Sequence, residues 1–296
     1  MTAPVGFVGL GVMGGAMSSH LLAAGTPVVG FDLDQGRLAE HRARGGLTAG
    51  SPAEVARQCS TVVLSLPHDA ALLAALDGPT GLLAGAAPGL VAVETSTLRL
   101  ATKEAAEERA RAAGVLLLDC PMSGTGAQAR TADLVAYVSG DDGAKARAQD
   151  ALTAFTRAVY DVGAFGNGTR MKLVANLLVG VHNLAAAEAL LLADRAGLDP
   201  DQVLAAVGDG AGSSRMFEVR GPMMVGGDFA EATMRVSTFL KDLDLIAGFA
   251  DELATPVPLL ALTTVFYRAA AAQGRGDQDT ACVYDVLAGM AAPRQE

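Results

Sequence analysis

Short apolar runs alternate with alanine-rich amphipathic stretches through the first half of the chain. The apolar runs are rich in β-branched residues, have the length of strands, and cover residues 5–8, 28–31, 62–66, 90–94, 115–119 and 134–139. Strands that alternate regularly with helices are typical of a parallel sheet covered by helices on both faces. We therefore predict an α/β fold for this half.

The alternation stops at about Gly163, and the pattern beyond it is helical. An Ala- and Leu-rich stretch, residues 171–196, is followed by a glycine and then a proline, as is common where a helix ends. We predict two domains: an α/β domain at residues 1–163, and an all-α domain at residues 164–296 that begins with this long interdomain helix. The glycine-rich segment 163–168 is the predicted hinge.

Three glycines follow the first apolar run in the pattern G-x-G-x-x-G. Gly9 permits a tight turn, Gly11 gives a pyrophosphate access to the backbone, and Gly14 lets the next helix, predicted at residues 13–24, pack closely on the sheet. The start of that helix offers unpaired N–H groups and the positive end of a dipole. This context predicts a Rossmann-type, dinucleotide-binding domain. The predicted cofactor contacts in the loop are Gly9, Gly11, Val12, Met13 and Gly14.

Asp32 ends the second apolar run, about 20 residues beyond the glycines. An acid at this position binds the ribose hydroxyls of NAD and repels the additional phosphate of NADP. We therefore predict NAD as the cofactor, although Arg37 nearby leaves NADP open. The alternative is that the glycines serve packing alone and that Asp32 caps a helix.

Composition limits the partners and the compartment. The chain has 296 residues, 51% of them hydrophobic, which is enough for a substantial buried core. Its formal net charge of −10 argues against nucleic acid or an anionic membrane surface, because both attract basic proteins. The first residues do not resemble a signal peptide, and no apolar run is judged long enough to span a bilayer. We predict a soluble, cytoplasmic protein.

The cysteines and histidines predict no metal site. Cys59, Cys120 and Cys282 lack the spacing of zinc ligands or of a disulfide framework, and we expect buried thiols in a reducing compartment. His182 is expected to serve packing or an interface. His68 lies on a loop that we expect on the cofactor side.

Four motifs extend along nearly the whole chain in a familiar order. They are GFVGLGVMGGAM at residues 6–17, DCPMSGTG at 119–126, GNGTRMKLVANLL at 166–178 and FLKDLDL at 239–245. In these motifs the chain resembles the β-hydroxyacid dehydrogenase family, of the 3-hydroxyisobutyrate dehydrogenase type. The glycine motif alone is far less specific than the four together.

The resemblance implies a set of roles. Lys172 is the catalytic general acid/base, and Asn176 contacts the substrate. Ser123 and Gly124, which follow a predicted strand, hold the substrate carboxylate. Further residues border the cofactor: Pro67, Ser96, Thr97 and Lys241.

Spacing supports part of this assignment. Lys172 and Asn176 are four residues apart and share one helix face, with Asn183 about three turns further on. A lysine has a reference pKa of about 10.4, so it needs burial or the positive charge of oxidised nicotinamide to act as a base. The alternative for Lys172 is a lysine that directs its charge to solvent from an amphipathic helix.

The other assignments have plainer alternatives. Ser123 and Gly124 are also compatible with an ordinary turn after a strand. Ser96 and Thr97 are compatible with a helix cap, and Lys241 with a solvated pair to Asp242.

This chain departs from the family pattern at three positions. Relatives commonly have a second glycine in place of Thr125 and an asparagine in place of Ala175. Residues 213–222, SSRMFEVRGP, are similar to the L-threonate dehydrogenase-like branch, but Arg215 stands where an aromatic residue is usual. Our hypothesis is that Arg215 meets a second anionic or polyhydroxylated end of the substrate, and the alternative is a surface arginine.

Together these features predict an oxidoreductase that transfers a hydride between NAD(H) and a small hydroxy acid or its semialdehyde. The alternatives are an NADPH-dependent reductase of an aldehyde or imine, and a non-catalytic dinucleotide-binding sensor. We expect a small carboxylate-bearing substrate, a homodimer or homotetramer built through the all-α half, and no nucleic-acid or membrane partner.

Overall fold

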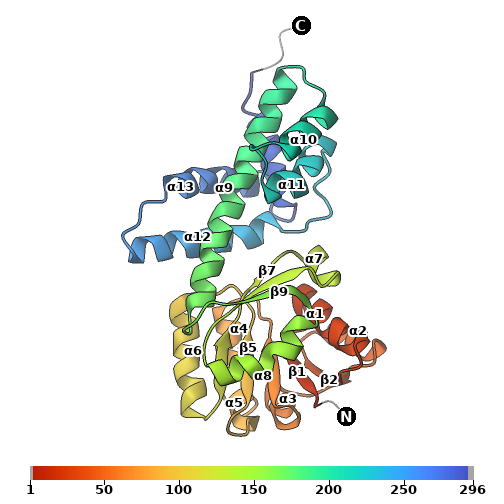
Figure 1. Cartoon of the computed structure of the whole chain (residues 1–296), viewed down its shortest axis with the longest axis vertical. Coiled ribbons are helices and arrows are strands. Elements are labelled where there is room, and N and C mark those ends of the chain that lie inside the picture. Colours follow the sequence, from red (N-terminus) through yellow and green to blue (C-terminus); the bar gives the residue numbers. More distant parts are fainter. Residues whose placement is uncertain (1–2, 293–296) are drawn as a thin grey trace. The chain divides into compact units, whose positions relative to one another are not determined.

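Six strands of the first half form a parallel sheet (Figure 1). A computed structural model describes residues 3–292 of the chain. Within them the main sheet has the order β3-β2-β1-β4-β5-β6, with every neighbouring pair parallel. The order changes direction between β1 and β4, the place where doubly wound sheets bind ligands. The strands are β1 (Val5–Val8), β2 (Val28–Phe31), β3 (Leu47–Thr48), β4 (Thr61–Leu64), β5 (Val91–Glu94) and β6 (Leu116–Asp119).

Alternating strand residues bury the two faces of this sheet in two separate cores. Phe7, Val63 and Leu118 belong to one core, whereas their chain neighbours Val8 and Leu64 belong to the other. Successive side chains of a strand point to opposite faces, so both faces must be covered. Helices α1 and α8 contribute to the first core, and α3, α4, α5 and α6 contribute to the second.

The helices of this half match the predicted alternation. Several begin at a side-chain cap, such as Ser51 before α3 and Asp141 before α8. The helices are α1 (Val12–Ala23), α2 (Gln35–Ala43), α3 (Pro52–Gln58), α4 (Asp69–Leu76), α5 (Leu82–Gly85), α6 (Leu100–Ala112), α7 (Gly126–Arg130) and α8 (Asp142–Thr153).

One predicted strand lies outside the main sheet. The run at residues 134–139 forms β8 (Leu134–Val138), which pairs antiparallel with β7 (Met122–Ser123) and parallel with β9 (Thr156–Asp161) in a second sheet. The chain enters β8 through α7, which has only five residues. A parallel crossover needs a dozen or more residues, so β8 cannot extend the main sheet from β6 in the usual way.

The second half is helical, as predicted. Among the described residues from 173 onward there is no strand. The long helix α9 begins at Asn167, four residues before the predicted start at Met171, so it includes part of the expected hinge. The helices are α9 (Asn167–Arg195), α10 (Pro200–Asp209), α11 (Arg215–Gly226), α12 (Val236–Glu252), α13 (Pro258–Ala272), the 3₁₀ helix η1 (Thr280–Cys282) and α14 (Val283–Ala288).

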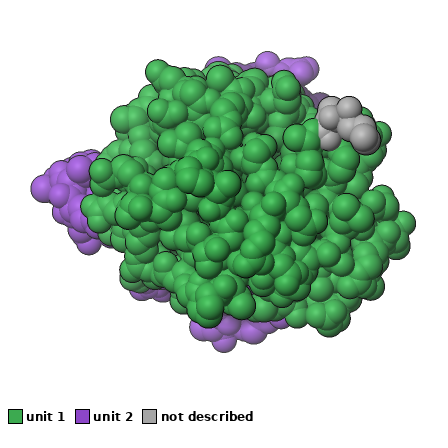
Figure 2. Space-filling view, turned by 90° about the horizontal axis from the view of Figure 1, so that it is seen from below, with its two compact units in different colours: residues 1–172 green, residues 173–296 purple. Residues whose placement is uncertain are grey.

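The chain forms two compact units, and the division falls within α9. Unit 1 ends at Lys172 and unit 2 begins at Leu173; Figure 2 colours them green and purple. The first turns of α9 are therefore part of the α/β unit. A division there differs from the sequence expectation at residue 163, because tertiary hydrogen bonds tie the start of α9 to the sheet, as described below.

Helix α9 is long and apolar enough to cross a membrane by length and composition, contrary to our judgement that no run of the sequence reaches that length. Core helices of globular proteins meet the same criteria. Its most apolar window is 44% buried, and Asn183 near the middle of the helix is buried and hydrogen-bonded within the protein.

Candidate active site

The glycine loop joins β1 to α1 at the change of strand direction. Gly9 has φ +93°, and a Cβ atom on it would lie 2.1 Å from the carbonyl oxygen of Ser65. A Cβ atom on Gly14 would lie 2.0 Å from the carbonyl oxygen of Gly9. Neither position accepts a side chain, because both contacts are with backbone.

Gly11 is different, because nothing in the protein requires it to be a glycine. Its backbone is extended, and the nearest atom to an added Cβ is Arg37 Nη1 at 3.5 Å, an ordinary van der Waals distance. The open space at Gly11 fits a group that approaches the backbone from outside. Gly11 is also the N-cap of α1 and provides no side-chain cap, so the first N–H groups of the helix stay open to an anion.

Helix α1 begins at Val12, one residue before the predicted start. Val12 is 70% exposed, although Gly9 before it and Gly14 after it are tightly packed. Leu33, directly after Asp32, is 89% exposed. These two apolar side chains flank the carboxyl ends of β1 and β2 and provide apolar surface for a flat ring.

Asp32 is buried at the end of β2 and holds the glycine loop. Its Oδ2 accepts the N–H of Leu10 at 2.7 Å, and its Oδ1 accepts the N–H of Asp34 at 2.9 Å. The cap of α2 is Asp34, so the alternative that Asp32 is a helix cap is wrong. Arg37 Nη1 lies 3.4 Å from Asp32 Oδ2, so a cation stands beside the carboxylate, over the loop.

The loops after β4 and β5 are linked by Ser96. Its Oγ accepts the N–H of Leu66 at 2.8 Å, and its own N–H donates to Glu94 Oε1 at 2.9 Å. The N-cap of the following helix α6 is Arg99, so the alternative that Ser96 or Thr97 caps a helix is wrong. Strand β4 ends at Leu64, and Pro67 is exposed in the loop that follows it.

His68, next to Pro67, has a local structural role. Its Nδ1 accepts the N–H of Ala71 at 3.1 Å and so caps α4.

A buried charge cluster that the sequence analysis missed lies directly below Ser96. The ammonium of Lys103 is 2.5 Å from Glu94 Oε2, 2.8 Å from Asp119 Oδ1 and 2.7 Å from the carbonyl oxygen of Ser96. All three ionisable side chains are fully buried. Burial by itself would lower the pKa of Lys103, but Asp119 and Glu94 hold it above its usual value. Burial raises the pKa of Glu94, more than Lys103 and Ser96 lower it.

Asp119 connects this cluster to the start of α9. Its Oδ2 accepts the backbone N–H of Thr169 at 2.7 Å, and its Oδ1 accepts the Thr169 hydroxyl at 2.8 Å. Gly168 donates its N–H to Ser139 Oγ at 3.0 Å. These bonds satisfy N–H groups that a helix start leaves unpaired, which is why α9 begins earlier than its sequence indicates.

Lys172 lies one turn beyond Thr169 on α9. The residue is 6% exposed, so the alternative of a lysine directed to bulk solvent is wrong. Asn176, one further turn along the helix, is also buried. Helical spacing puts both side chains on one stripe of α9, as predicted.

Ser123 and Gly124 follow β6 on the short strand β7 and the turn after it. Gly124 has φ +139°, which excludes most side chains. Thr125, the departure from the family pattern, caps α7: its hydroxyl accepts the N–H of Gln128, and Gln128 Oε1 accepts the N–H of Thr125 at 3.0 Å. This capping box gives the threonine a local structural reason. Nothing in the structure explains Ala175.

In unit 2, Asn176 is held by Asp242, for which the alternative in the sequence analysis was a solvated pair with Lys241. Asn176 Nδ2 donates to Asp242 Oδ2 at 2.9 Å, and Lys241 Nζ lies 3.2 Å from Asp242 Oδ1. Asp242 is buried, so the alternative of a solvated charge is wrong for this residue. Its burial could have been predicted from the sequence, because Phe239, Asp242 and Ile246 follow the helical spacing of the buried face of α12.

Asn183 and Arg215, also in unit 2, have local partners. Asn183 Nδ2 donates to Tyr267 Oη at 2.5 Å and to the carbonyl of Thr280 at 2.9 Å, deep in the helical core. Arg215 begins α11, is 67% exposed, and pairs with Glu218 at 3.0 Å.

The three cysteines are buried, as predicted, and burial raises the pKa of Cys59 to about 12 and of Cys282 to about 11. Among the described residues no group of His, Cys, Asp and Glu side chains has the arrangement of a metal site.

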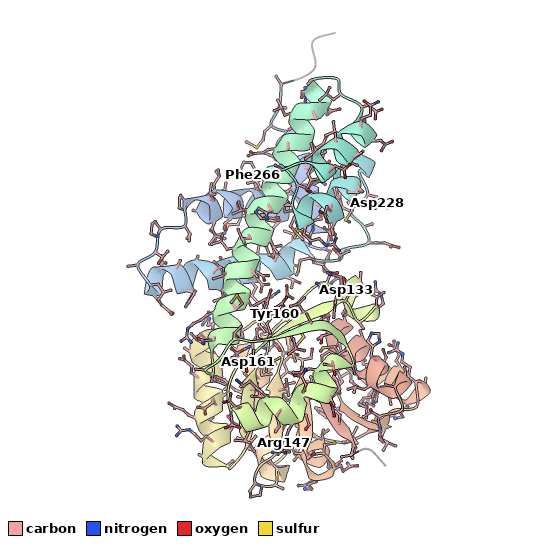
Figure 3. The ribbon with its side chains drawn as sticks, viewed as in Figure 1. Asp133, Arg147, Tyr160, Asp161, Asp228 and Phe266 are labelled. Carbon is pink, nitrogen blue, oxygen red and sulfur yellow. The ribbon has the colours of Figure 1, made fainter. Side chains whose placement is uncertain are left out.

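A hollow of about 570 Å³ on the outside of unit 1, between α8 and β9, does not belong to this site. Lys145 in it pairs with Asp142 and with Asp161, which is labelled in Figure 3, each at 2.8 Å. The charged side chains of this hollow are thus paired with each other, and no residue of the glycine loop lines it.

Two family models match successive parts of the chain. Residues 4–163 match the NAD binding domain of 6-phosphogluconate dehydrogenase. Residues 166–287 match the model described as NAD-binding of NADP-dependent 3-hydroxyisobutyrate dehydrogenase.

Individual proteins are similar over the same length. The L-threonate dehydrogenase of Cupriavidus necator is 34% identical over 294 residues, which are 99% of this chain and 99% of that protein. The crystal structure of a 3-hydroxyisobutyrate dehydrogenase from Salmonella typhimurium is 32% identical, with a TM-score of 0.85 over 96% of this chain and 99% of that one. The Mycobacterium tuberculosis 3-hydroxyisobutyrate dehydrogenase, whose structure includes L-serine, is 27% identical, with a TM-score of 0.87 over 97% and 99%.

Proposed function

The chain belongs to the β-hydroxyacid dehydrogenase family, and from that premise we propose that it transfers a hydride between NAD and a small hydroxy acid or its semialdehyde, with Lys172 as the general acid/base. The observation that carries the proposal is the buried lysine on the first turns of α9. Its helix start is bonded to the carboxyl end of β6, in the same unit as a glycine loop whose middle glycine is open to a ligand.

In this proposal the protein holds the dinucleotide through the backbone of the glycine loop, the α1 N-terminus and the Asp32 carboxylate. The nicotinamide supplies hydride chemistry when it is bound. Lys172 takes the hydroxyl proton of the hydroxy acid during oxidation and returns it during reduction.

The substrate carboxylate is assigned to Ser123 and to the backbone N–H groups at Gly124. A carboxylate only accepts hydrogen bonds, and this turn offers donors without a side chain at Gly124. Asn176 contacts the substrate in this scheme. Because Asp242 accepts a hydrogen from Nδ2 of Asn176, its amide is held in one orientation with the oxygen available to a substrate hydroxyl.

Lys172→Ala tests the function directly. We expect turnover to fall by about 10²–10⁴-fold, the usual contribution of a general acid/base. The dissociation constant of reduced dinucleotide, measured by fluorescence, should stay within about twofold, because Lys172 is not among the cofactor-holding groups. The assay uses a panel of C3 to C5 hydroxy acids, L-threonate included, with both cofactors. Undiminished turnover in this variant would contradict the proposal, and a wild type that binds dinucleotide without turnover would favour a sensor.

NAD is the proposed cofactor because the Asp32 carboxylate is buried at the end of β2, where the ribose hydroxyls are held. Arg37 beside it favours NADP, as does the match of residues 166–287 to a model described as NADP-dependent. For Asp32→Asn we expect the preference for NAD over NADP, measured as a ratio of kcat/KM values, to fall by about tenfold or more. The loss of one hydrogen bond to a charged group costs about 1.5–3 kcal/mol. An unchanged ratio would remove the argument, and Arg37→Ala should shift it the opposite way.

L-threonate and related polyhydroxylated acids are the proposed substrate class, because the relative from C. necator carries that activity in its name. Arg215 is proposed to meet the far end of such a substrate. Arg215 is 67% exposed and pairs with Glu218 through Nη1, and a guanidinium carries further N–H donors. Equal losses of kcat/KM by Arg215→Ala on mono- and dianionic substrates would reject this role.

The proposed assembly is a homodimer or homotetramer in the cytoplasm. Leu259, Leu262 and Val265 on α13 are all more than half exposed, and a row of apolar side chains on one helix favours self-association. The acidic net charge is consistent with no nucleic-acid or membrane partner.

A further inference from the structure

Lys103 links the loop after β5 to Asp119, the residue that holds the start of α9. Its ammonium donates to the carbonyl oxygen of Ser96 and contacts Glu94 at the end of β5. The same ammonium contacts Asp119 at the end of β6. Asp119 in turn holds Thr169, one turn before Lys172.

The path from Ser96 through Lys103 and Asp119 to Thr169 is buried and hydrogen-bonded at each step. Glu94 and Asp119 are paired strand residues in the register of β5 and β6, so their backbones are fixed by the sheet. Lys103, Asp119 and Thr169 are at most 1% exposed, and each bond along the path is 2.5–2.8 Å long. A displacement at either end therefore has to break a buried charged hydrogen bond.

Stability does not by itself explain such a cluster. Buried ion pairs can usually be replaced by apolar side chains of similar volume with no loss of stability, because the ions lose their hydration. A buried charged network fixes the orientation of its groups, because each hydrogen bond tolerates only a narrow range of distance and angle. Apolar packing does not fix orientation in this way.

Both ends of the path carry residues of the proposed site. One end is the Ser96 loop, assigned to the cofactor, and the other is the helix turn that carries Lys172. We propose that Lys103, acting through Asp119 and Thr169, is a positioning residue that sets the Lys172 ammonium relative to the cofactor-side loop at Ser96. This role rests on the proposed function, because it gives Lys172 and Ser96 the parts assigned above.

The test removes one bond of the path and leaves the buried charges paired. In Thr169→Val the hydroxyl bond to Asp119 is lost, whereas the backbone N–H bond and the Lys103 contacts remain. Thr169→Ser restores a hydroxyl and is the conservative comparison. Thr156→Val is the matched control, because it removes a hydroxyl bond of 2.8 Å, to the carbonyl of Leu152, elsewhere in unit 1. Lys103→Met is the more direct change but leaves two buried carboxyls, so a failure of it to fold does not decide the matter.

We expect kcat of Thr169→Val to fall by about 10- to 100-fold, the effect of a misplacement of about 1 Å at a catalytic group. The dissociation constant of reduced dinucleotide and the KM for the hydroxy acid should stay within about twofold. Thr169→Ser should recover most of kcat, and Thr156→Val should have the wild-type kcat.

A purely structural role predicts another pattern, in which both valine variants lower the unfolding temperature and neither changes kcat. That pattern, or a change in KM alone, overturns the positioning role. Wild-type kcat in Thr169→Val beside an inactive Lys172→Ala overturns this inference and leaves the proposed function standing. Full turnover in Lys172→Ala overturns both.

Discussion

Three glycines of one loop are glycines for different reasons. Gly9 and Gly14 have backbone atoms about 2 Å from where a Cβ would stand, whereas Gly11 has open space. The motif G-x-G-x-x-G predicted these separate roles from spacing alone. The structure adds that, of the three, only Gly11 has room for a Cβ atom within the protein.

This difference predicts opposite effects for two substitutions. Gly14→Ala should destabilise the fold by about 1–3 kcal/mol or more, because its methyl group meets a backbone carbonyl that cannot move aside. Gly11→Ala should change the free energy of unfolding by less than about 1 kcal/mol, since its extended backbone accepts alanine. Dinucleotide affinity should nevertheless fall about tenfold or more in Gly11→Ala. Urea unfolding and fluorescence titration measure the two quantities, and similar effects of both variants would contradict the assignment.

At the same scale, charged residues mark the limit of sequence reasoning. Lys172 and Asn176 were predicted as site residues because their helical spacing and the surrounding motif agreed. Lys103 and Asp242 were missed because a charged residue on a helix is solvated by default. Lys103 shares its stripe of α6 with the buried Ala106 and Ala110, and that spacing was the available signal.

Among the elements, α2 depends on a buried histidine. The ring of His41 packs against Gly30 and Gly46, where an added Cβ would lie 2.9 and 2.1 Å from ring atoms. His41 thus joins α2 to β2 and to the turn before β3. Burial lowers the pKa of His41 below its usual 6.5, more than its backbone hydrogen bonds raise it.

The lowered pKa predicts a loss of stability in mild acid. Below about pH 6.5 the unfolded chain binds a proton at this histidine more readily than the folded chain does. The free energy of unfolding therefore decreases as the pH is lowered. The loss is at most about 1.4 kcal/mol per pH unit from this group. Urea unfolding at pH 7.5 and 5.5 should therefore show a smaller difference for His41→Leu than for the wild type. The same pH dependence in both proteins would show that His41 is not responsible.

Element boundaries were predicted where local chemistry defines them. β1 and β2 begin and end as predicted, because a proline precedes each apolar run and a glycine or an aspartate follows it. The run that forms β8 was predicted as part of the parallel sheet, but it lies in the second sheet. A hydrophobic pattern predicts a strand and does not indicate which other strand it pairs with. Strands β3 and β7 are two residues long, too short for a periodic pattern.

For the whole molecule, the fold class and the family followed from the order of motifs. The α/β half and the all-α half are both present, and similar proteins match along the whole chain. The division into compact units at Lys172 depends instead on hydrogen bonds at the α9 start that no local pattern announces.

Self-association is the prediction that belongs to this scale. Leu262→Asp places a charge in the exposed apolar row of α13, and burial of an unpaired charge at an interface is costly. We expect this variant to shift toward monomer by light scattering coupled to size-exclusion chromatography. Leu47→Asp, at an equally exposed leucine of unit 1, is the control and should leave the mass unchanged. A monomeric wild type would contradict the proposed assembly.

The sequence alone determined the parallel sheet, the helical second half, the family, and the helix that carries Lys172 and Asn176. These follow from periodicity and from short motifs, which depend on neighbours in the chain. Only the tertiary structure decided the second small sheet, the early start of α9, and the burial of Lys103, Asp119 and Asp242 with their partners. Those depend on which segments meet in space, because the pairing of buried charges is set by residues 16 to 66 positions apart.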